Sequence, residues 1–184
     1  MNLKLAFGLL LLAPLANCAT NPVTGRQNFV MMSESEEVST GRKADQEVRK
    51  EYGAYDLPTL QQYVSEIGQK LAKVSHRPQL DYRFTVLDSP EINAFALPGG
   101  YIYITRCIIA YLNSEAELAA VLGHEIGHVT ARHSVQQYSA ATATGIGATV
   151  LGILVPELGS SPAQNVLGLY GNAMLSGYGR DHEM

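Results

Sequence analysis

The sequence predicts an α+β domain that is mainly helical, with a small β-sheet beside a central helix. Apolar residues recur at helical spacing in residues 58–74 and 114–138, whereas strand-like alternation is confined to residues 82–105 between them. The 184 residues are 46% hydrophobic and 16% charged, which is typical of a globular domain that buries a core. The formal net charge is −4 and no tract of Lys or Arg occurs, so we expect no nucleic-acid partner.

The N-terminus has the form of an export signal. Lys4 precedes an apolar segment, residues 5–15, that is too short to span a bilayer. The residues that follow, up to Cys18, resemble the end of a bacterial lipoprotein signal, in which the cysteine is lipidated and becomes the first mature residue. We therefore expect residues 1–18 to be a signal peptide ending at the lipidation site. The alternative is an ordinary secretory signal with an unmodified cysteine, because Asn17 stands where a smaller residue is usual; both forms leave the cytoplasm.

The second cysteine, Cys107, is predicted to be a small buried apolar residue, since no neighbouring signal suggests an activating base. If Cys18 carries lipid, no internal disulfide can form. If it does not, a bridge between Cys18 and Cys107 is conceivable in an oxidising compartment.

The first part of the mature chain predicts a tether and two helices. Residues 19–32 contain the turn-forming run Asn-Pro-Val-Thr-Gly and are expected to link the anchor to the domain. Ser33 and Glu36 have capping-box spacing and start a polar helix that ends near Tyr52. Pro58 starts a second helix with one apolar face, which should end near residues 76–78.

Three short strands are predicted next. Residues 82–86 alternate between apolar and polar side chains, residues 92–97 form a second extended run, and residues 101–105 are β-branched and aromatic. Pro-Gly-Gly at residues 98–100 is a turn, so the last two strands are expected to pair as a hairpin.

A third helix carries the most informative motif. Ser114 and Glu117 form another capping-box pattern, and the helix is expected to run to about Tyr138. Its apolar face consists of Leu118, Val121, Leu122, Ile126 and Val129. The apolar, glycine-rich residues 143–155 predict a core or lid element, with a membrane-facing element as the alternative, and residues 163–178 again have helical character.

His124, Glu125 and His128 form the pattern H-E-x-x-H, which is characteristic of zinc sites. Residues four apart lie on one face of a helix, so both imidazoles can bind a single Zn²⁺ ion. Glu125 is displaced by one residue and is expected to border the metal, where it can take a proton from a metal-bound water. It falls in line with the apolar face, where a charged group is costly unless it is paired or used in chemistry.

A catalytic zinc site of this kind needs a third protein ligand. The downstream candidates are His133, Glu157, Asp181, His182 and Glu183. On a continuous helix His133 points away from the metal, so it is better explained as a surface histidine or as one that supports a ligand. Glu157 follows a proline in a predicted loop, whereas a glutamate at the end of the last helical stretch would complete a His₂Glu site.

At three places the sequence resembles peptidase family M48, in particular its bacterial lipoprotein and periplasmic members. The matching segments are residues 21–26 (NPVTGR), 93–100 (NAFALPGG) and 117–128 (ELAAVLGHEIGH), and the match continues to His133. The resemblance covers nearly all of the chain after Cys18. It implies a zincin-like metallopeptidase domain over residues 33–184.

The resemblance also implies the remaining ligand. In the family, a glutamate in the pattern Glu-x-x-x-Asp, preceded by an arginine, is the third ligand, and Arg180 and Glu183 match the first part of this pattern. Glu183 is therefore the expected ligand. The aspartate would fall beyond Met184, so we expect a domain that is truncated at its C-terminus.

By the same resemblance, we expect zinc-dependent endopeptidase activity on unfolded or misfolded envelope proteins, in the periplasm and anchored to the outer membrane. Asn93, Ala94 and Phe95 are expected to lie in an edge strand that binds the substrate main chain, with an ordinary core strand as the alternative. Other functions remain open: a non-catalytic, chaperone-like binding module of the same fold, an inactive fragment, or a different hydrolase with this motif, such as an aminopeptidase.

Overall fold

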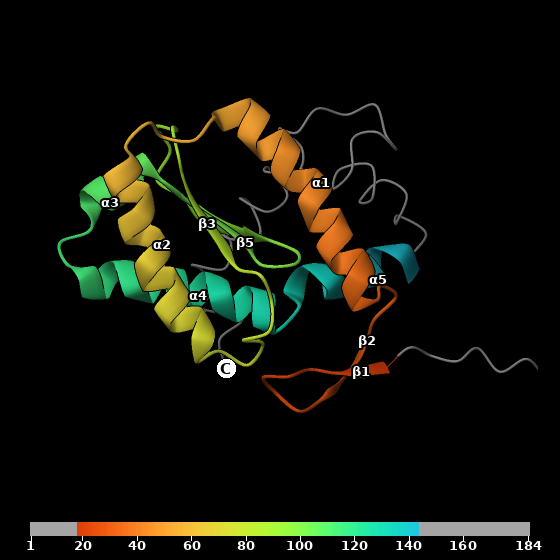
Figure 1. Ribbon diagram of the computed structural model, residues 1–184. Coiled ribbons are helices and arrows are strands. Elements are labelled where there is room, and N and C mark those ends of the chain that lie inside the picture. The colour runs from red at the N-terminus through yellow and green to blue at the C-terminus, as the bar shows by residue number, and fades with distance from the viewer. Residues whose placement is uncertain (1–17, 144–184) are drawn as a thin grey trace, which may run out of the picture.

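A three-stranded sheet lies between two layers of helices in residues 18–143, the part of the chain that the computed structural model describes (Figure 1). The helices are α1 (Glu34–Tyr52), α2 (Pro58–Lys73), α3 (Arg106–Tyr111), α4 (Glu115–Thr130) and α5 (His133–Ala143). The strands are β1 (Cys18–Thr20), β2 (Gln27–Phe29), β3 (Arg83–Leu87), β4 (Ala94–Leu97) and β5 (Tyr101–Thr105). The mainly helical α+β class is confirmed.

The sheet has the strand order β3-β5-β4, with β5 parallel to β3 and antiparallel to β4. The predicted hairpin between β4 and β5 is confirmed. Its turn contains Gly99 and Gly100, whose φ angles of 79° and 98° lie in the left-handed region that favours glycine. Among the described residues, β4 is therefore an outer strand with one unpaired edge.

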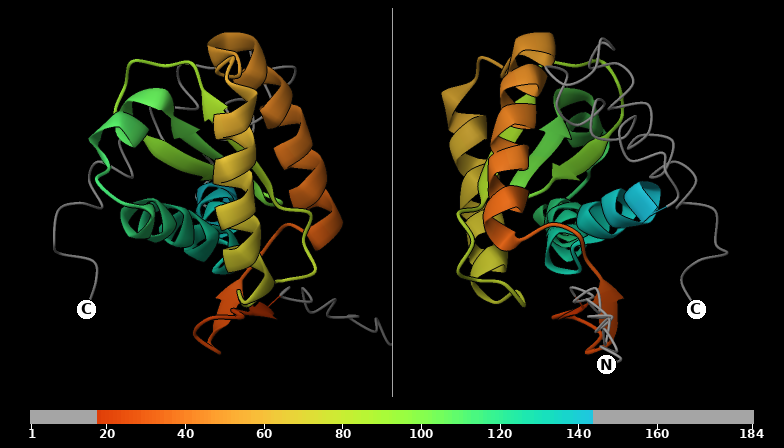
Figure 2. Two further views of the ribbon diagram at one scale, coloured as in Figure 1. Left: turned by 60° about the vertical axis from the view of Figure 1, so that its left-hand side comes forward. Right: turned by 90° about the vertical axis from the view of Figure 1, so that its right-hand side faces the viewer.

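Side chains alternate strictly between the two faces of the sheet. One face, with Ala94, Ala96 and Ile102, packs into a core with α2 and α4. The other face, with Phe95 and Tyr103, packs against α1. Figure 2 shows this arrangement from two sides, with α2 in front of the sheet in the left view and α1 in front of the sheet in the right view. All four side chains of β4 are buried, which agrees with its uniformly apolar sequence and shows that both faces of the sheet are covered at this strand.

Helix α1 begins and ends as the sequence predicts. Ser33 and Glu36 form the expected capping box, and the N–H of Gly53 closes the other end on the carbonyl of Arg49. The helix lies so close to the β4–β5 turn that a Cβ added to Gly41 would be 1.8 Å from the carbonyl oxygen of Pro98. Only glycine permits this approach between the two backbones.

Helix α2 ends at Lys73, a few residues before the expected stop. At the start of α4, the hydroxyl of Ser114 accepts the N–H of Glu117, as predicted. The carboxylate of Glu117 does not complete the box in the usual way: it accepts the N–H of Asn113, one residue earlier, at 2.7 Å. The helix thus begins where expected, but the Glu117 carboxylate binds the backbone one residue before the N-cap.

The predicted continuous helix from residue 114 to Tyr138 is wrong. Helix α4 ends at Thr130, Arg132 adopts the left-handed conformation with φ 57°, and α5 begins at His133. A residue in this conformation cannot continue a right-handed helix, so α5 leaves in a new direction.

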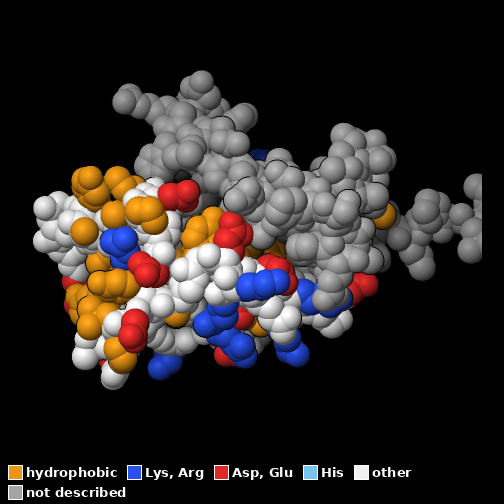
Figure 3. All heavy atoms as spheres, turned by 90° about the horizontal axis from the view of Figure 1, so that it is seen from above, with side chains coloured by type: hydrophobic (Ala, Val, Ile, Leu, Met, Phe, Trp, Pro, Cys, Tyr) orange, Lys and Arg blue, Asp and Glu red, His pale blue; other side chains and the backbone are white. Residues whose placement is uncertain are grey.

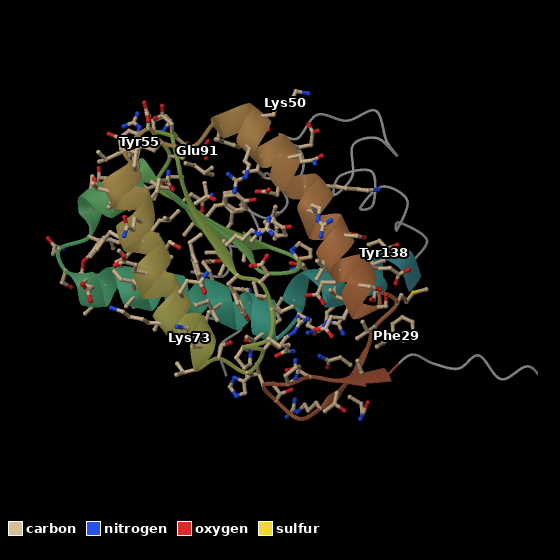
Figure 4. All side chains as sticks on the ribbon, viewed as in Figure 1. Phe29, Lys50, Tyr55, Lys73, Glu91 and Tyr138 are labelled. Carbon is tan, nitrogen blue, oxygen red and sulfur yellow. The ribbon has the colours of Figure 1, made fainter. Side chains whose placement is uncertain are left out.

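Residues 19–32, predicted as a tether, form the antiparallel hairpin β1–β2 and contact α5. Val30, Met32 and Val135 make a small buried cluster there, and the N–H of Met31 donates to the hydroxyl of Ser139 at 2.8 Å. Figure 4 shows Phe29 and Tyr138 at this same end of the molecule.

The visible surface mixes charged and apolar side chains (Figure 3). Apolar side chains gather at the end where α3 lies, and exposed Leu57, Ile92 and Tyr111 are among the large hydrophobic residues of the surface. Within residues 18–143, no helix combines the length and the apolar character needed to cross a bilayer.

Candidate metal centre

Helix α4 presents the motif residues in the way the sequence predicts. Leu118, Leu122 and Ile126 bury its inner face in the core shared with α2 and the sheet. His124 is exposed and His128 is half-buried, so the outer face of the same helix carries both imidazoles. Packing of the apolar face fixes the rotation of α4 and therefore the direction of the histidines.

The two imidazoles converge. Nε2 of His124 and Nε2 of His128 lie 3.0 Å apart, and the ring centroids are separated by 4.7 Å. Burial, together with the charges of His124 and His133, lowers the pKa of His128 to about 4. His128 is therefore neutral at physiological pH, which is the form of imidazole that binds a metal ion.

Glu125 lies in the interior. It is 3% exposed, and its Oε2 is a buried atom for which the described residues provide no hydrogen-bond partner. Burial raises the pKa of this carboxyl to about 8. A buried polar atom without a partner is unusual and points to a ligand or reaction that uses it.

His133 contacts the motif, which a continuous helix would forbid. Its Nδ1 lies 2.9 Å from Nδ1 of His128, so His128 has one ring nitrogen toward His124 and the other toward His133. The expectation that His133 points away from the site is wrong, because it assumed that the helix continues through Arg132. The alternative role considered for it, as a histidine that supports a ligand, matches this position.

A buried group of charges lies behind the turn from α4 to α5. Glu37 accepts hydrogen bonds from Arg77 and Arg132, each at 2.8 Å, and Arg77 also donates to Glu34 at 2.6 Å. The sequence alone did not indicate this group of charges. No local pattern relates residues 37, 77 and 132, so only the fold brings them together.

The residues present fit a divalent metal. Two nitrogens that bind one zinc ion at about 2.0–2.1 Å with tetrahedral angles lie about 3.3 Å apart, close to the observed separation of the imidazoles. The orphaned oxygen of Glu125 supplies the adjacent carboxylate that such chemistry needs. Within residues 18–143, no cluster of three or more possible metal ligands occurs.

Several predicted site residues lie outside the described residues. These are Glu157, Asp181, His182 and Glu183, together with the signal peptide and most of the apolar stretch 143–155. Glu183 therefore stays a prediction as the third ligand.

The predicted substrate-binding residues belong to β4 and its start. The side chains of Ala94 and Phe95 are buried, and the ring of Phe95 stacks on Tyr103 with a centroid distance of 4.8 Å. Asn93 is half-buried, and its carbonyl accepts the N–H of Thr105. The side chains of Ala94 and Phe95 thus form core, and the role of this strand in substrate binding stays a prediction.

Comparison with known protein families gives a match to one family. The model of peptidase family M48 matches residues 58–184, which include α4 and its motif. The chain belongs to family M48. The matched residues include both the helix with the paired histidines and the three-stranded sheet beside it.

Relatives from bacteria and from mitochondria share the domain. A beta-barrel assembly-enhancing protease of Yersinia pestis is 36% identical over 64% of the chain and 24% of its own length. The mitochondrial metalloendopeptidase OMA1 of Schizosaccharomyces pombe is 35% identical over 63% of the chain and 35% of its own length. A beta-barrel assembly-enhancing protease of Escherichia coli is 28% identical over 85% of the chain and 34% of its own length. The M48 chain thus spans between about a quarter and a third of these relatives.

Proposed function

We propose that the chain is the zinc-binding part of an M48 metalloendopeptidase that hydrolyses unfolded or misfolded proteins of the cell envelope. One observation carries the proposal: Glu125, a buried carboxyl whose Oε2 finds no hydrogen-bond partner within residues 18–143, follows directly on one of two imidazoles whose Nε2 atoms face each other at 3.0 Å. A purely structural helix has no need for this combination, since it leaves a desolvated oxygen unsatisfied.

Each residue has a distinct role in the proposed reaction. His124 and His128 would hold the ion, with Glu183 as the third ligand. When bound, the ion would supply Lewis-acid chemistry, polarising a peptide carbonyl and lowering the pKa of a water molecule. Glu125 takes the proton from the attacking water and passes it to the leaving amine, for which a carboxyl with a raised pKa is suited.

The outer strand β4 is the proposed binding place for the substrate main chain. The N–H of Thr105 in β5 donates to the carbonyl of Asn93, the residue before β4, so the alternation of an antiparallel ladder directs the N–H and C=O groups of Ala94 and Ala96 toward the edge that no described strand pairs with. An extended peptide can pair with these groups irrespective of its sequence, which suits unfolded substrates.

The decisive experiment compares Glu125→Gln with the parent chain. We expect Glu125→Gln to bind zinc as the parent does and to lose cleavage of unfolded casein by at least about 100-fold, because the general base is missing. Glu115→Gln is the matched control: it removes an exposed carboxylate from the same helix and should cleave normally.

The results also separate the alternatives. Undiminished cleavage by Glu125→Gln contradicts the role of Glu125. A parent chain that binds zinc and prevents aggregation of casein without cleaving it indicates a chaperone-like module. Products shortened from one end, as seen by mass spectrometry, indicate an aminopeptidase.

The place of action is proposed as the periplasmic face of the outer membrane, with lipid on Cys18. The signal-like N-terminus supports this proposal, and so does the similarity to bacterial proteases named for the assembly of β-barrels.

A further inference from the structure

The turn between α4 and α5 is held from several directions. Arg77 donates from Nη1 to the carbonyl of Val129 at 3.2 Å. Asn21 and Gln136 both donate to the carbonyl of Ala131, at 3.3 and 2.6 Å. These carbonyls lie at the C-terminal end of α4, where the regular helical pattern of partners ends, and the N–H of Arg132 also donates to the carbonyl of Val129. Arg77 and Asn21 come from distant parts of the chain and help to fix the place where the motif helix stops.

Arg132 gives the turn its shape. Its φ of 57° is unusual for a residue other than Gly, Asn or Asp and has an energetic cost. The side chain shows what offsets this cost: Nε donates to Oε2 of Glu37 at 2.8 Å, and Nη2 donates to the carbonyl of Met32 at 3.0 Å.

Glu37 is a rigid support for Arg132. It is 1% exposed, and its other oxygen is bound by Arg77, which is itself 3% exposed. Buried charges keep fixed positions because loss of a partner leaves an uncompensated charge in the interior. Helix α1, the segment after α2 and the α4–α5 turn are therefore joined at one carboxylate.

The turn changes where His133 lies. Continuing α4 by five residues would place His133 about 140° around the helix from His128. In the structure the turn instead brings Nδ1 of His133 to 2.9 Å from Nδ1 of His128, while Nε2 of His128 faces His124. One nitrogen of His128 is thus directed to the metal position and the other to a partner that orients the ring.

We propose that Arg132 is a positioning residue of the metal centre: clamped by Glu37, it holds the left-handed turn that sets His133 against His128 and so fixes the orientation of a ligand. The inference rests on the proposed zinc site. It goes further by linking the buried charges of α1 to the geometry of the ligand.

A double-mutant cycle on zinc affinity tests the proposal. Zinc binding by the full chain is measured in competition with a chromogenic chelator for the parent, Arg132→Ala, His133→Ala and the double variant. We expect His133→Ala to weaken binding roughly tenfold, as loss of a partner of a metal-binding histidine does. Arg132→Ala should weaken it similarly in the parent, and by less than about twofold once His133 is absent, because Arg132 acts through His133.

Two further variants separate positioning from stability. Arg49→Ala breaks an ion pair with Asp45 on α1 and should leave zinc affinity unchanged. Arg132→Gly permits the left-handed backbone without the clamp and replaces Arg132→Ala in the cycle if that variant fails to fold by circular dichroism.

The outcomes are distinguishable from those of the proposed function. A parent chain that binds no zinc overturns the proposed zinc site and this inference together. A parent that binds zinc, with independent effects of Arg132 and His133 or with no effect of Arg132, overturns this inference alone.

Discussion

The unusual position of Glu125 was predictable from the sequence. It stands in line with the apolar face of α4, where a carboxylate is expected only if something uses it. The structure places it in the interior, where its Oε2 meets no hydrogen-bond partner from the described part of the chain, and burial raises its pKa to about 8. In the absence of metal, this residue works against the stability of the fold.

The metal-free chain should show this cost in the pH dependence of unfolding. Because the pKa of Glu125 is raised in the folded state, ionising this carboxyl costs more there than in the unfolded chain. The free energy of unfolding of the parent should therefore fall as the pH rises from about 4.5 to about 8. Glu125→Gln should lack this loss. Urea unfolding with EDTA at pH 5 and pH 8.5 measures it.

The control for that measurement is Glu115→Gln, since Glu115 lies on the same helix but is exposed. It should keep the pH dependence of the parent. If Glu125→Gln and the parent lose stability in parallel over this range, the assignment of the raised pKa to Glu125 is contradicted.

At the scale of elements, local patterns predicted what local interactions decide. The capping box at Ser33, Pro58 at the start of α2 and the glycine turn before β5 were all predictable. The turn at Arg132 was not, because arginine carries no preference for the left-handed region and the groups that hold it there come from distant positions. The contact of His133 with His128 was missed for the same reason.

Pairing of strands was predictable in part. The β4–β5 hairpin follows from its short turn, but the parallel pairing of β3 with β5 joins strands that are separated by β4, and no local signal specifies it. The sheet order, and with it the position of β4 beside α4, therefore required the structure.

The close approach of α1 to the β4–β5 turn predicts that Gly41→Ala is destabilising. Its Cβ would overlap the carbonyl oxygen of Pro98, so we expect a loss of about 1–3 kcal/mol in the free energy of unfolding, as for other overpacked sites. Gly123→Ala is the matched control: nothing lies within 4 Å of the added Cβ, and it should gain up to about 1 kcal/mol from helix propensity. Equal effects in urea unfolding would refute the packing argument.

At the scale of the whole molecule, the first hairpin links the N-terminus to the candidate metal centre. Asn21 in this hairpin donates to the carbonyl of Ala131, next to the end of α4. The sequence predicted a turn here from Asn-Pro-Val-Thr-Gly, but it did not predict the contacts of the hairpin with α5, because these depend on where α5 lies.

Cys18→Ser tests the proposed anchor in cells. We expect the parent protein to partition into the detergent phase with the membranes and Cys18→Ser to be released, because acyl chains on the cysteine supply the membrane affinity. Cys107→Ser, which changes the other cysteine, should behave as the parent does. If Cys18→Ser stays with the membranes, as Cys107→Ser does, the protein is not bound to the membrane through a lipid on Cys18.

The docked hairpin has a consequence for which substrates could be reached. Strand β1 begins at Cys18, which pairs with Phe29, and the same hairpin is hydrogen-bonded to the end of α4 and to α5. A folded segment, and not a flexible linker, thus connects a lipid on Cys18 to the paired histidines. An anchored molecule would then hold its paired histidines at a set height above the bilayer, and polypeptides stalled close to that surface would be cut in preference to those diffusing far from it.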